Sequence, residues 1–141
     1  MDSERHERGL VDTSVVIDLE HLDPVDLPRE LAVSAVTMAE LAAGPHAAHS
    51  SEERARRQDR LQRMEASFDP LPVDADVARA YARMYAAVAA AGGTVPGRRA
   101  FDLLIAATAL AAELPLFTRN PQDFTGLSGL LEVVAVSPVP R

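Results

Sequence analysis

Four acidic residues, drawn from distant parts of the chain, stand where a carboxylate is costly. Asp12 follows the apolar pair Leu10-Val11, Glu40 and Asp102 stand in largely apolar helical patterns, and Asp123 follows a strand end near residue 118. Burying a carboxylate costs several kcal/mol unless it is paired or binds a metal. Carboxylate oxygens suit Mg²⁺ and Mn²⁺, and such cations activate water and stabilise the leaving oxygen of a phosphodiester. The four acids are therefore candidate catalytic residues and candidate metal ligands.

Two of these acids also have a plain structural explanation. Asp12 could cap the helix that follows it, since a carboxylate readily accepts a hydrogen bond from the first-turn backbone. Glu40 stands three residues after Thr37 and could close a capping box at the start of a helix. For Glu40 taken alone, capping is the better interpretation.

The other two acids have similar alternatives. Asp102 could neutralise Arg98 or Arg99 in the first turn of its helix, where the helix dipole favours an anion. Asp123 could be an ordinary surface acid of a turn. No single acid is specific, so the case for a joint site depends on the elements that carry them.

Short apolar runs and helical periodicity alternate along the chain. They predict strands at 9–12, 31–34, 114–118 and 132–136, and helices at 13–19, 37–43, 50–67, 74–91 and 100–113. Such alternation indicates an α/β fold, a three-layer α/β/α sandwich around a mostly parallel sheet. In these sheets ligands bind beyond the carboxyl ends of the strands, where Asp12 and the turn 118–120 would lie.

Several helix boundaries carry recognisable signals. Thr13 or Ser14 is expected to cap the first helix, Ser50 with Glu53 forms a capping-box pair, and Asp74 is expected to cap the fourth helix. Gly44-Pro45 and the glycine pair 92–93 are expected to end two of the helices.

Composition limits the class of protein. The 141 residues suit one domain, which we expect over 9–137 with polar tails at 1–8 and 138–141. The absence of cysteine excludes disulfides, thiolate nucleophiles and sulfur-ligated zinc, and fits a reducing cytosol. The longest uncharged apolar run, 103–112, is half of the ~20 residues that a membrane span needs, and no secretory signal precedes it. A cytoplasmic protein without membrane contact is expected.

The order and settings of the four acids resemble those of the PIN-domain ribonucleases, specifically the VapC-type toxins of bacterial toxin–antitoxin pairs. The matching segments are LVDTSVVIDL, SAVTMAEL, RRAFDLLIAATAL and LFTRNPQDF, and the resemblance runs from residue 9 to about 136. By position, Asp12, Glu40 and Asp102 match the three acids of that family. The fourth acidic position falls in the last segment, where Asp123 is favoured, with Asn120 and Thr118 lining the site. Ser14 matches the small hydroxyl residue that supports the first acid.

The resemblance implies a PIN or 5′-nuclease-like fold and Mg²⁺- or Mn²⁺-dependent cleavage of RNA phosphodiester bonds, by which a toxin inhibits translation and growth. It also implies a homodimer and a cognate antitoxin that covers the site, assembled in a toxin–antitoxin hetero-oligomer.

All basic residues are arginine, and the net charge is −7, so RNA would need a local positive field. Five arginines lie between residues 54 and 63, either as a solvated face paired with Glu52, Glu53 and Glu65 or as an RNA contact. The candidate RNA-binding residues are Arg57 and Arg60 in this run, and Arg98, Arg99 and Arg119 beside the acidic segments. The four histidines, at positions 6, 21, 46 and 49, are interpreted as surface residues.

Two other functions compete with the nuclease. A phospho-receiver signalling domain resembles this chain in size and fold, but such domains have an acidic pair at the first strand and a lysine at a late strand. Here one acid follows the first strand and the chain contains no lysine. A non-catalytic PIN-like binding module is the second alternative, although all of the expected acids are present.

Overall fold

The computed structural model describes residues 5–93 and 97–137, with only the backbone of residue 98. Four strands form one parallel sheet in the order β2-β1-β3-β4. They are β1 (Arg8–Val11), β2 (Glu30–Ala32), β3 (Leu116–Thr118) and β4 (Val133–Ala135). The central strands β1 and β3 pair Leu10 with Leu116 and Val11 with Phe117, although more than a hundred residues separate them. Because all four strands run the same way, their carboxyl ends meet at one edge.

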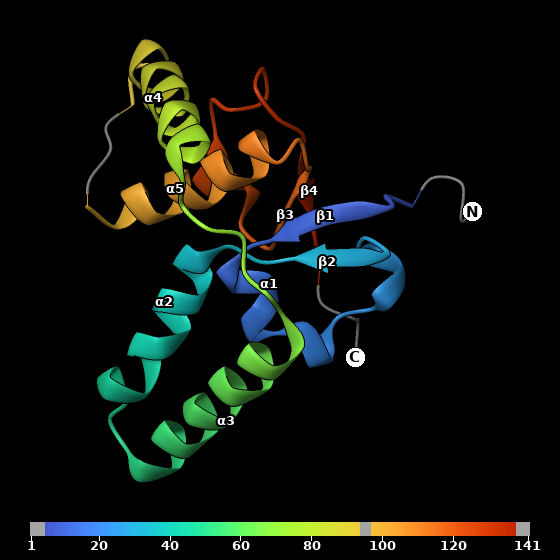
Figure 1. Ribbon diagram of the computed structural model, residues 1–141, viewed down its shortest axis with the longest axis vertical. Coiled ribbons are helices and arrows are strands. Elements are labelled where there is room, and N and C mark those ends of the chain that lie inside the picture. Colours follow the sequence, from blue (N-terminus) through green and yellow to red (C-terminus); the bar gives the residue numbers. More distant parts are fainter. Residues whose placement is uncertain (1–4, 94–96, 138–141) are drawn as a thin grey trace.

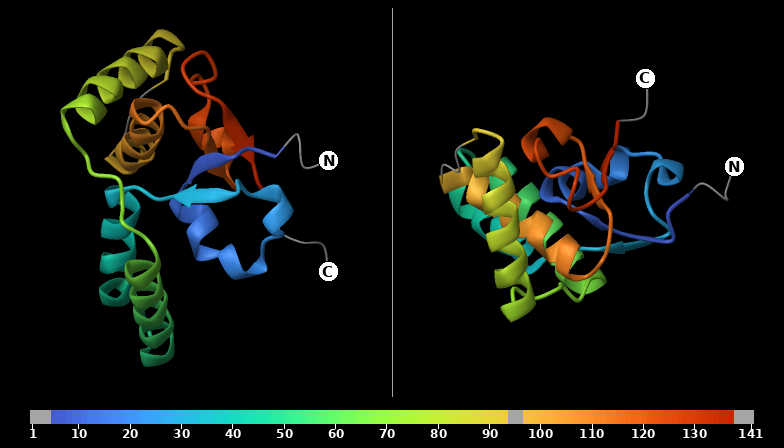
Figure 2. Two further views of the ribbon diagram at one scale, coloured as in Figure 1. Left: turned by 45° about the vertical axis from the view of Figure 1, so that its right-hand side comes forward. Right: turned by 90° about the horizontal axis from the view of Figure 1, so that it is seen from above.

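Five helices accompany the sheet: α1 (Thr13–Ile17), α2 (Ala35–Ala43), α3 (Ser51–Ser67), α4 (Ala75–Ala90) and α5 (Gly97–Ala111). Figure 1 shows α2 and α3 extending together from one end of the sheet, with α4 and α5 packed against each other at the other. The same arrangement is visible from the side in Figure 2. The predicted α/β fold with a parallel sheet is confirmed.

Alternating side chains of the central strands enter two separate cores. Leu10 and Leu116 belong to the core beneath α4 and α5, which includes Met84 and Leu103. Val11 and Phe117, the next residues along the two strands, belong to the second core with Val15 of α1 and its neighbours in α2 and α3. Successive side chains of a strand point to opposite faces, so this register places helices on both sides of the sheet.

Most predicted elements are present with shifted ends. β1 has its expected length but begins one residue earlier, the other three strands are shorter than expected, and α5 begins at Gly97, three residues before the predicted start. The Ser50 hydroxyl accepts from the Glu53 backbone at 3.1 Å, as the capping pair predicts. Asp74 likewise caps α4 by accepting from the backbone of Val77 at 3.0 Å. Ends are the least certain part of any sequence assignment, since tertiary contacts extend or shorten a helix by a turn.

The segment assigned to a polar N-terminal tail contacts the domain from residue 5 onward. Arg5 donates to the carbonyl oxygens of Leu27 and Pro24, at 2.9 and 2.7 Å. The ring of His6 is 34% exposed and meets Phe117 edge-on at 5.4 Å between centroids, so this surface residue also packs against the domain. β1 itself begins at residue 8. The predicted C-terminal tail, 138–141, lies outside the described residues.

Among the described helices, none combines the length and the apolar character that crossing a membrane requires.

Gly9 of β1 supplies the first stability test, because it is buried where β1 passes the ring of Phe117. A Cβ at this position would lie 2.7 Å from Phe117 Cδ1 and 3.1 Å from Pro28 Cγ. We expect Gly9→Ala to lower the free energy of unfolding by roughly 1–3 kcal/mol, the usual cost of overpacking. Urea denaturation measures this change in the free energy of unfolding. Gly129→Ala is the control, since its Cβ would meet nothing within 4 Å. Equal stability of the two variants would contradict the tight β1–Phe117 packing.

Candidate active site

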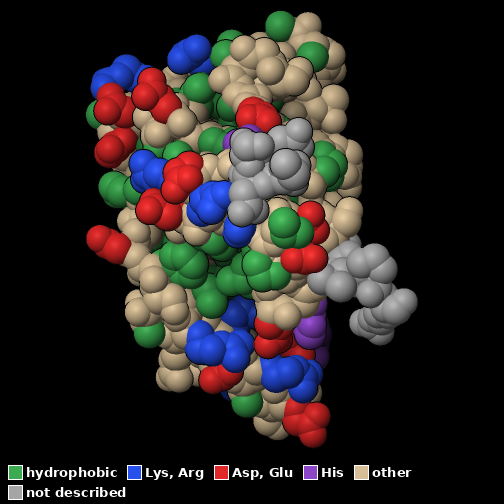
Figure 3. Space-filling view, turned by 90° about the vertical axis from the view of Figure 1, so that its right-hand side faces the viewer, with side chains coloured by type: hydrophobic (Ala, Val, Ile, Leu, Met, Phe, Trp, Pro, Cys, Tyr) green, Lys and Arg blue, Asp and Glu red, His purple; other side chains and the backbone are tan. Residues whose placement is uncertain are grey.

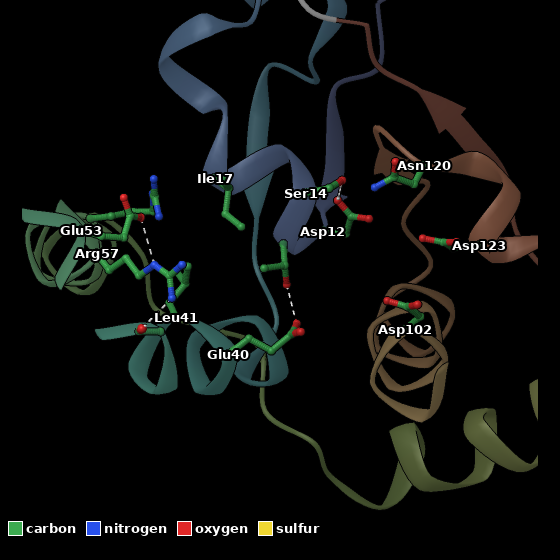
Figure 4. A pocket seen from close by; sticks show the side chains of 13 residues that line it. Asp12, Ser14, Ile17, Glu40, Leu41, Glu53, Arg57, Asp102, Asn120 and Asp123 are labelled. Atoms are coloured by element: carbon green, nitrogen blue, oxygen red, sulfur yellow. Dashed lines mark hydrogen bonds and ion pairs between the residues drawn. The ribbon is translucent and has the colours of Figure 1, made fainter. Parts of the chain in front are cut away.

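A cavity of about 480 Å³ opens at the carboxyl ends of β1 and β3, and all four candidate acids line it. Its walls come from the two loops after these strands and from α1, α2, α3 and α5. Figure 4 shows the carboxylates of Asp12, Asp102 and Asp123 facing the same space, with Glu40 directed into it from α2. The remaining lining residues are Thr13, Ser14, Ile17, Leu41, Gly44, Glu53, Arg57, Arg60 and Asn120.

Asp12 is both a helix cap and a wall of the cavity. Its side chain is 6% exposed. Its Oδ1 accepts from the Val15 backbone at 3.1 Å and from the Ser14 hydroxyl at 2.6 Å. Asp12, and neither Thr13 nor Ser14, is therefore the N-cap of α1. Burial raises the pKa of Asp12 above its ordinary value, and the bonds from Ser14 and Thr118 oppose that rise.

A chain of hydroxyl groups ties the loop after β1 to the loop after β3. The Ser14 hydroxyl accepts from the Arg119 backbone at 3.0 Å and lies 3.5 Å from Thr118 Oγ1. The Thr118 hydroxyl accepts from the Asn120 backbone at 3.0 Å. Ser14 and Asn120 line the cavity as predicted, whereas Thr118 is fully buried behind its wall. Thr118 thus supports the site instead of lining it, which corrects the expectation from the sequence.

Glu40 lies in the second half of α2, so the capping-box interpretation is wrong. The N-cap of α2 is Ser34, whose hydroxyl accepts from the Thr37 backbone at 3.0 Å. Glu40 Oε1 instead accepts a hydrogen bond of 2.6 Å from the hydroxyl of Thr13. The Thr13 oxygen is also 3.0 Å from Thr37 Oγ1, so α1 and α2 are joined at this point. From the sequence, Thr13 is expected only as a cap, because nothing local indicates a partner 27 residues away.

Asp102 and Asp123 approach the cavity from the opposite side to Glu40 (Figure 4). Since α5 begins at Gly97, Asp102 lies in its second turn, and the expected first-turn position is wrong. Asp123 belongs to a 3₁₀ turn at Pro121–Phe124, anchored by the buried ring of Phe124. Both acids are half-buried. Within the described residues, no group of three or more acidic or histidine side chains is close enough to hold one metal ion. The acids surround a shared space without forming a closed shell.

The candidate RNA-binding arginines divide into two groups. Arg57 and Arg60 of α3 line the cavity. Arg119 pairs with Asp18, and Arg99 makes a long bond of 3.5 Å to the carbonyl of Thr125. Neither Arg99 nor Arg119 is among the described residues that line the cavity, and the side chain of the fifth candidate, Arg98, lies outside the described residues.

Comparison with known proteins places this arrangement in a family. The PIN domain model matches residues 9–128. The chain belongs to the PIN-domain family. Ribonuclease VapC5 of Mycobacterium tuberculosis is 40% identical over 128 residues, covering 89% of this chain and 91% of the relative. Ribonuclease VapC4 of the same organism is 35% identical over 132 residues, covering 92% and 97%.

A solved structure has the same fold as this PIN domain. The crystal structure of VapBC-5, a member of the VapBC family of toxin–antitoxin systems from Mycobacterium tuberculosis, superposes with a TM-score of 0.81. Its sequence identity is 39%, and the match covers 92% of this chain and 99% of that one. The family resemblance inferred from the four segments is therefore confirmed over nearly the whole PIN domain.

The burial of Asp12 predicts how the stability of the metal-free PIN domain changes when its charge is removed. A folded-state pKa above the unfolded value of 3.8 means that folding favours the protonated acid. Its favourable contribution is present below pH 3.8 and is lost as pH rises through the folded pKa. In EDTA at pH 7, Asp12→Asn should therefore raise the melting temperature, since asparagine also caps helices. The gain should shrink towards pH 4, as protonation of the parent removes the same charge.

The matched control is Asp74→Asn, which alters the exposed N-cap of α4. It should leave the melting temperature nearly unchanged across the same pH range. A lower melting temperature for Asp12→Asn in EDTA at pH 7 would show that the ionised carboxylate stabilises the metal-free fold, contrary to the burial argument.

Proposed function

We propose that this PIN domain is a divalent-metal-dependent endoribonuclease and the toxin of a toxin–antitoxin pair. The observation that carries the proposal is the single cavity lined by carboxylates from four distant segments, at the carboxyl edge of a parallel sheet. Its relatives include proteins named as ribonucleases at 35% and 40% identity over most of the chain. Neither the receiver domain nor the non-catalytic module is supported by any of these relatives.

The donor set of the cavity fits Mg²⁺ or Mn²⁺. Asp12, Glu40, Asp102 and Asp123 supply carboxylate oxygens, Asn120 adds an amide oxygen, and no histidine lines the cavity among the described residues. Hard oxygen ligands suit Mg²⁺ and Mn²⁺ better than they suit zinc or copper ions. Mg²⁺ usually keeps several waters and is held directly by one or two carboxylates, so acids spread around an open space are compatible with it. The burial of Asp12 is a second reason, because a neighbouring cation would favour the ionised form of a carboxylate that has lost most of its contact with water.

The four acids would hold the cation, directly or through its bound waters, and it would supply positive charge for the phosphoryl oxygens and favour ionisation of an attacking water. The chain's own hydrogen bonds orient the acids. Ser14 and Val15 bind one oxygen of Asp12 and so fix the plane of its carboxylate. Thr13 binds one oxygen of Glu40 in the same way. Each bond leaves the second oxygen of the acid for the cavity, so these ligands are pre-oriented by the backbone turn after β1.

An antitoxin is the expected protein partner. The VapBC-5 structure is that of a toxin–antitoxin system, and its sequence and fold match this chain over nearly its full length. A cognate antitoxin would cover the cavity and keep RNA away from the carboxylates. We propose in addition that the toxin is a homodimer and that the toxin and its antitoxin assemble in a larger hetero-oligomer.

Asp102→Asn tests the metal site directly, because it removes one ligand charge with little change in volume. RNA cleavage should be abolished in this variant, and in the parent it should stop in EDTA and return with Mg²⁺ or Mn²⁺. A cation at a hundredfold excess over its Kd should stabilise the parent by about 2.7 kcal/mol, which is several degrees in melting temperature. The variant should lose most of that rise.

Asp76→Asn is the control for Asp102→Asn, since it removes the same charge from the exposed first turn of α4. It should keep both cleavage and the metal response. Cleavage by Asp102→Asn at the parental rate, or a parent that melts identically in EDTA and Mn²⁺, would overturn the proposed site.

Thr13 offers a separate test of how Glu40 is oriented. Thr13→Val keeps the shape of the side chain and removes the hydroxyl that binds Glu40. Loss of an outer hydrogen bond to a metal ligand typically costs 10–100-fold in activity or metal affinity, so a loss of roughly that size is expected. Thr13→Ser restores the hydroxyl and should restore most of the activity. If Thr13→Val and Thr13→Ser cleave RNA equally well, the hydroxyl has no part in positioning Glu40.

A further inference from the structure

Two arginines of α3 line the same cavity as the four acids. Arg57 and Arg60 stand three residues apart, close to one helical turn, and both belong to the cavity wall. Figure 4 shows Arg57 entering from the side of α3, across the cavity from Asp12, Asp102 and Asp123. The cavity therefore has an anionic end formed by the acids and a cationic end formed by these arginines.

The guanidinium of Arg57 is held in a fixed orientation. Its Nε donates to Glu53 Oε1 at 3.0 Å and its Nη1 donates to the carbonyl oxygen of Gly44 at 2.8 Å. The side chain is 32% exposed, far less than that of the neighbouring Arg56 at 62%. A guanidinium carries five N–H donors in a planar fork, so two anchoring bonds leave donors for a ligand. Pre-orientation of this kind lowers the entropy that binding has to overcome.

Arg60 is placed differently, between two hollows of the surface. It lines the main cavity and also a second groove of about 260 Å³ formed with α1 and the following turn. Within the described part of the chain, Arg60 forms no ion pair or side-chain hydrogen bond. Ile17 belongs to both hollows as well, so the groove continues the cavity along α3.

Of the three other arginines of α3, Arg56 and Arg63 are paired with acids, and Arg54 does not line the cavity. Arg63 pairs with Asp59 at 3.1 Å, and Arg56 shares the carboxylate of Glu53 with Arg57. Figure 3 shows that acidic and basic side chains alternate at the lower end of the molecule, where α3 lies. That exposed surface is the mixed, solvated face expected from the sequence. The cavity face differs, because α3 contributes two arginines, Arg57 and Arg60, and one acid, Glu53, to the described lining.

We propose that Arg57 and Arg60 bind a phosphate group of the RNA that flanks the phosphate being cut. This inference rests on the proposed ribonuclease function and adds a binding subsite to it. RNA entering the cavity meets five carboxylates, Glu53 among them, in a protein of net charge −7, so a polyanion needs a nearby positive group to bind. Arginine suits this purpose because its N–H fork matches phosphate oxygens. Since Arg57 enters across the cavity from Asp12, Asp102 and Asp123, the phosphate held by the arginines is a different one from that at these aspartates.

The test measures RNA binding apart from cleavage. In an Asp102→Asn background with Mg²⁺, the Kd of a fluorescent pool of random-sequence 20-nucleotide single-stranded RNA is measured at several salt concentrations. We expect Arg57→Ala and Arg60→Ala each to weaken binding about tenfold, in line with the loss of a charged hydrogen bond. Each should reduce the slope of log K against log salt by about 0.7. Arg57→Lys should keep the slope, because the charge remains, and lose part of the affinity.

Arg56→Ala is the matched control, because it removes the same charge one residue away and the same Glu53 partner, but from the exposed face. Its salt slope should equal that of the background. Arg57→Ala also breaks the bond to Gly44, so melting temperatures accompany every variant, and Arg60→Ala tests the subsite without that bond. In the otherwise parental chain, the rise in melting temperature with Mn²⁺ should survive both substitutions, which separates this subsite from the acids.

The outcomes distinguish this inference from the proposed function. If the Asp102→Asn protein binds RNA but Arg57→Ala and Arg60→Ala match Arg56→Ala in Kd and slope, the subsite is wrong and the nuclease proposal stands. If the parent protein cleaves no cellular RNA and the background variant binds none, both are overturned.

Discussion

The site is organised around the buried carboxylate of Asp12. At 6% exposure, this acid has lost most of its contact with water, and burial raises its pKa. Its oxygen is satisfied by the first turn of α1 and by Ser14. These bonds require α1 to begin immediately after β1, and Ser14 in turn accepts from the loop that follows β3. The hydrogen bonds that stabilise the buried carboxylate of Asp12 thus link the end of β1 to the end of β3.

The parallel sheet makes this concentration of polar groups tolerable. β1 and β3 send alternate side chains into two apolar cores, so the strands need no polar residue along their length. Their carboxyl ends leave the cores at the same edge, and polar side chains gather there because both faces of the sheet are occupied. Thr118 shows the transition: it is the last residue of β3, fully buried, and its hydroxyl already belongs to the polar network.

Charge is separated within the cavity. Four of the lining acids come from the strand-end loops, α2 and α5, whereas both lining arginines come from α3 together with one acid, Glu53. α2 and α3 are joined by the bond from Arg57 to Gly44, so the cationic wall is fixed relative to Glu40. A polyanion approaching such a cavity is attracted at one end and repelled at the other until a cation is bound among the acids. This polarity would give an RNA strand a defined position relative to the carboxylates.

Much of the fold could be predicted from the sequence because its signals are local. The glycine pair at 92–93, the caps at Ser50 and Asp74 and the apolar runs indicate where most elements begin and end. The association of Asp12, Glu40 and Asp102 was also predictable, since their surrounding segments match a known pattern in the same order. That pattern indicated the acids but not the hydrogen bonds by which neighbouring residues such as Thr13 orient them.

The sequence by itself determined which elements form and which acids belong to the site, because capping, periodicity and short motifs act over a few residues. Only the tertiary structure decided the contacts between distant segments. Glu40 looked like a cap until α2 proved to begin at Ser34 and to turn the acid towards Thr13. The sequence offers Arg57 as a candidate RNA contact or as part of a solvated face, and its bond to Gly44 and its place in the cavity wall come only from the tertiary structure. Such partners are separated by 13 to 27 residues, and the geometry that joins them is set by how the helices pack around the sheet.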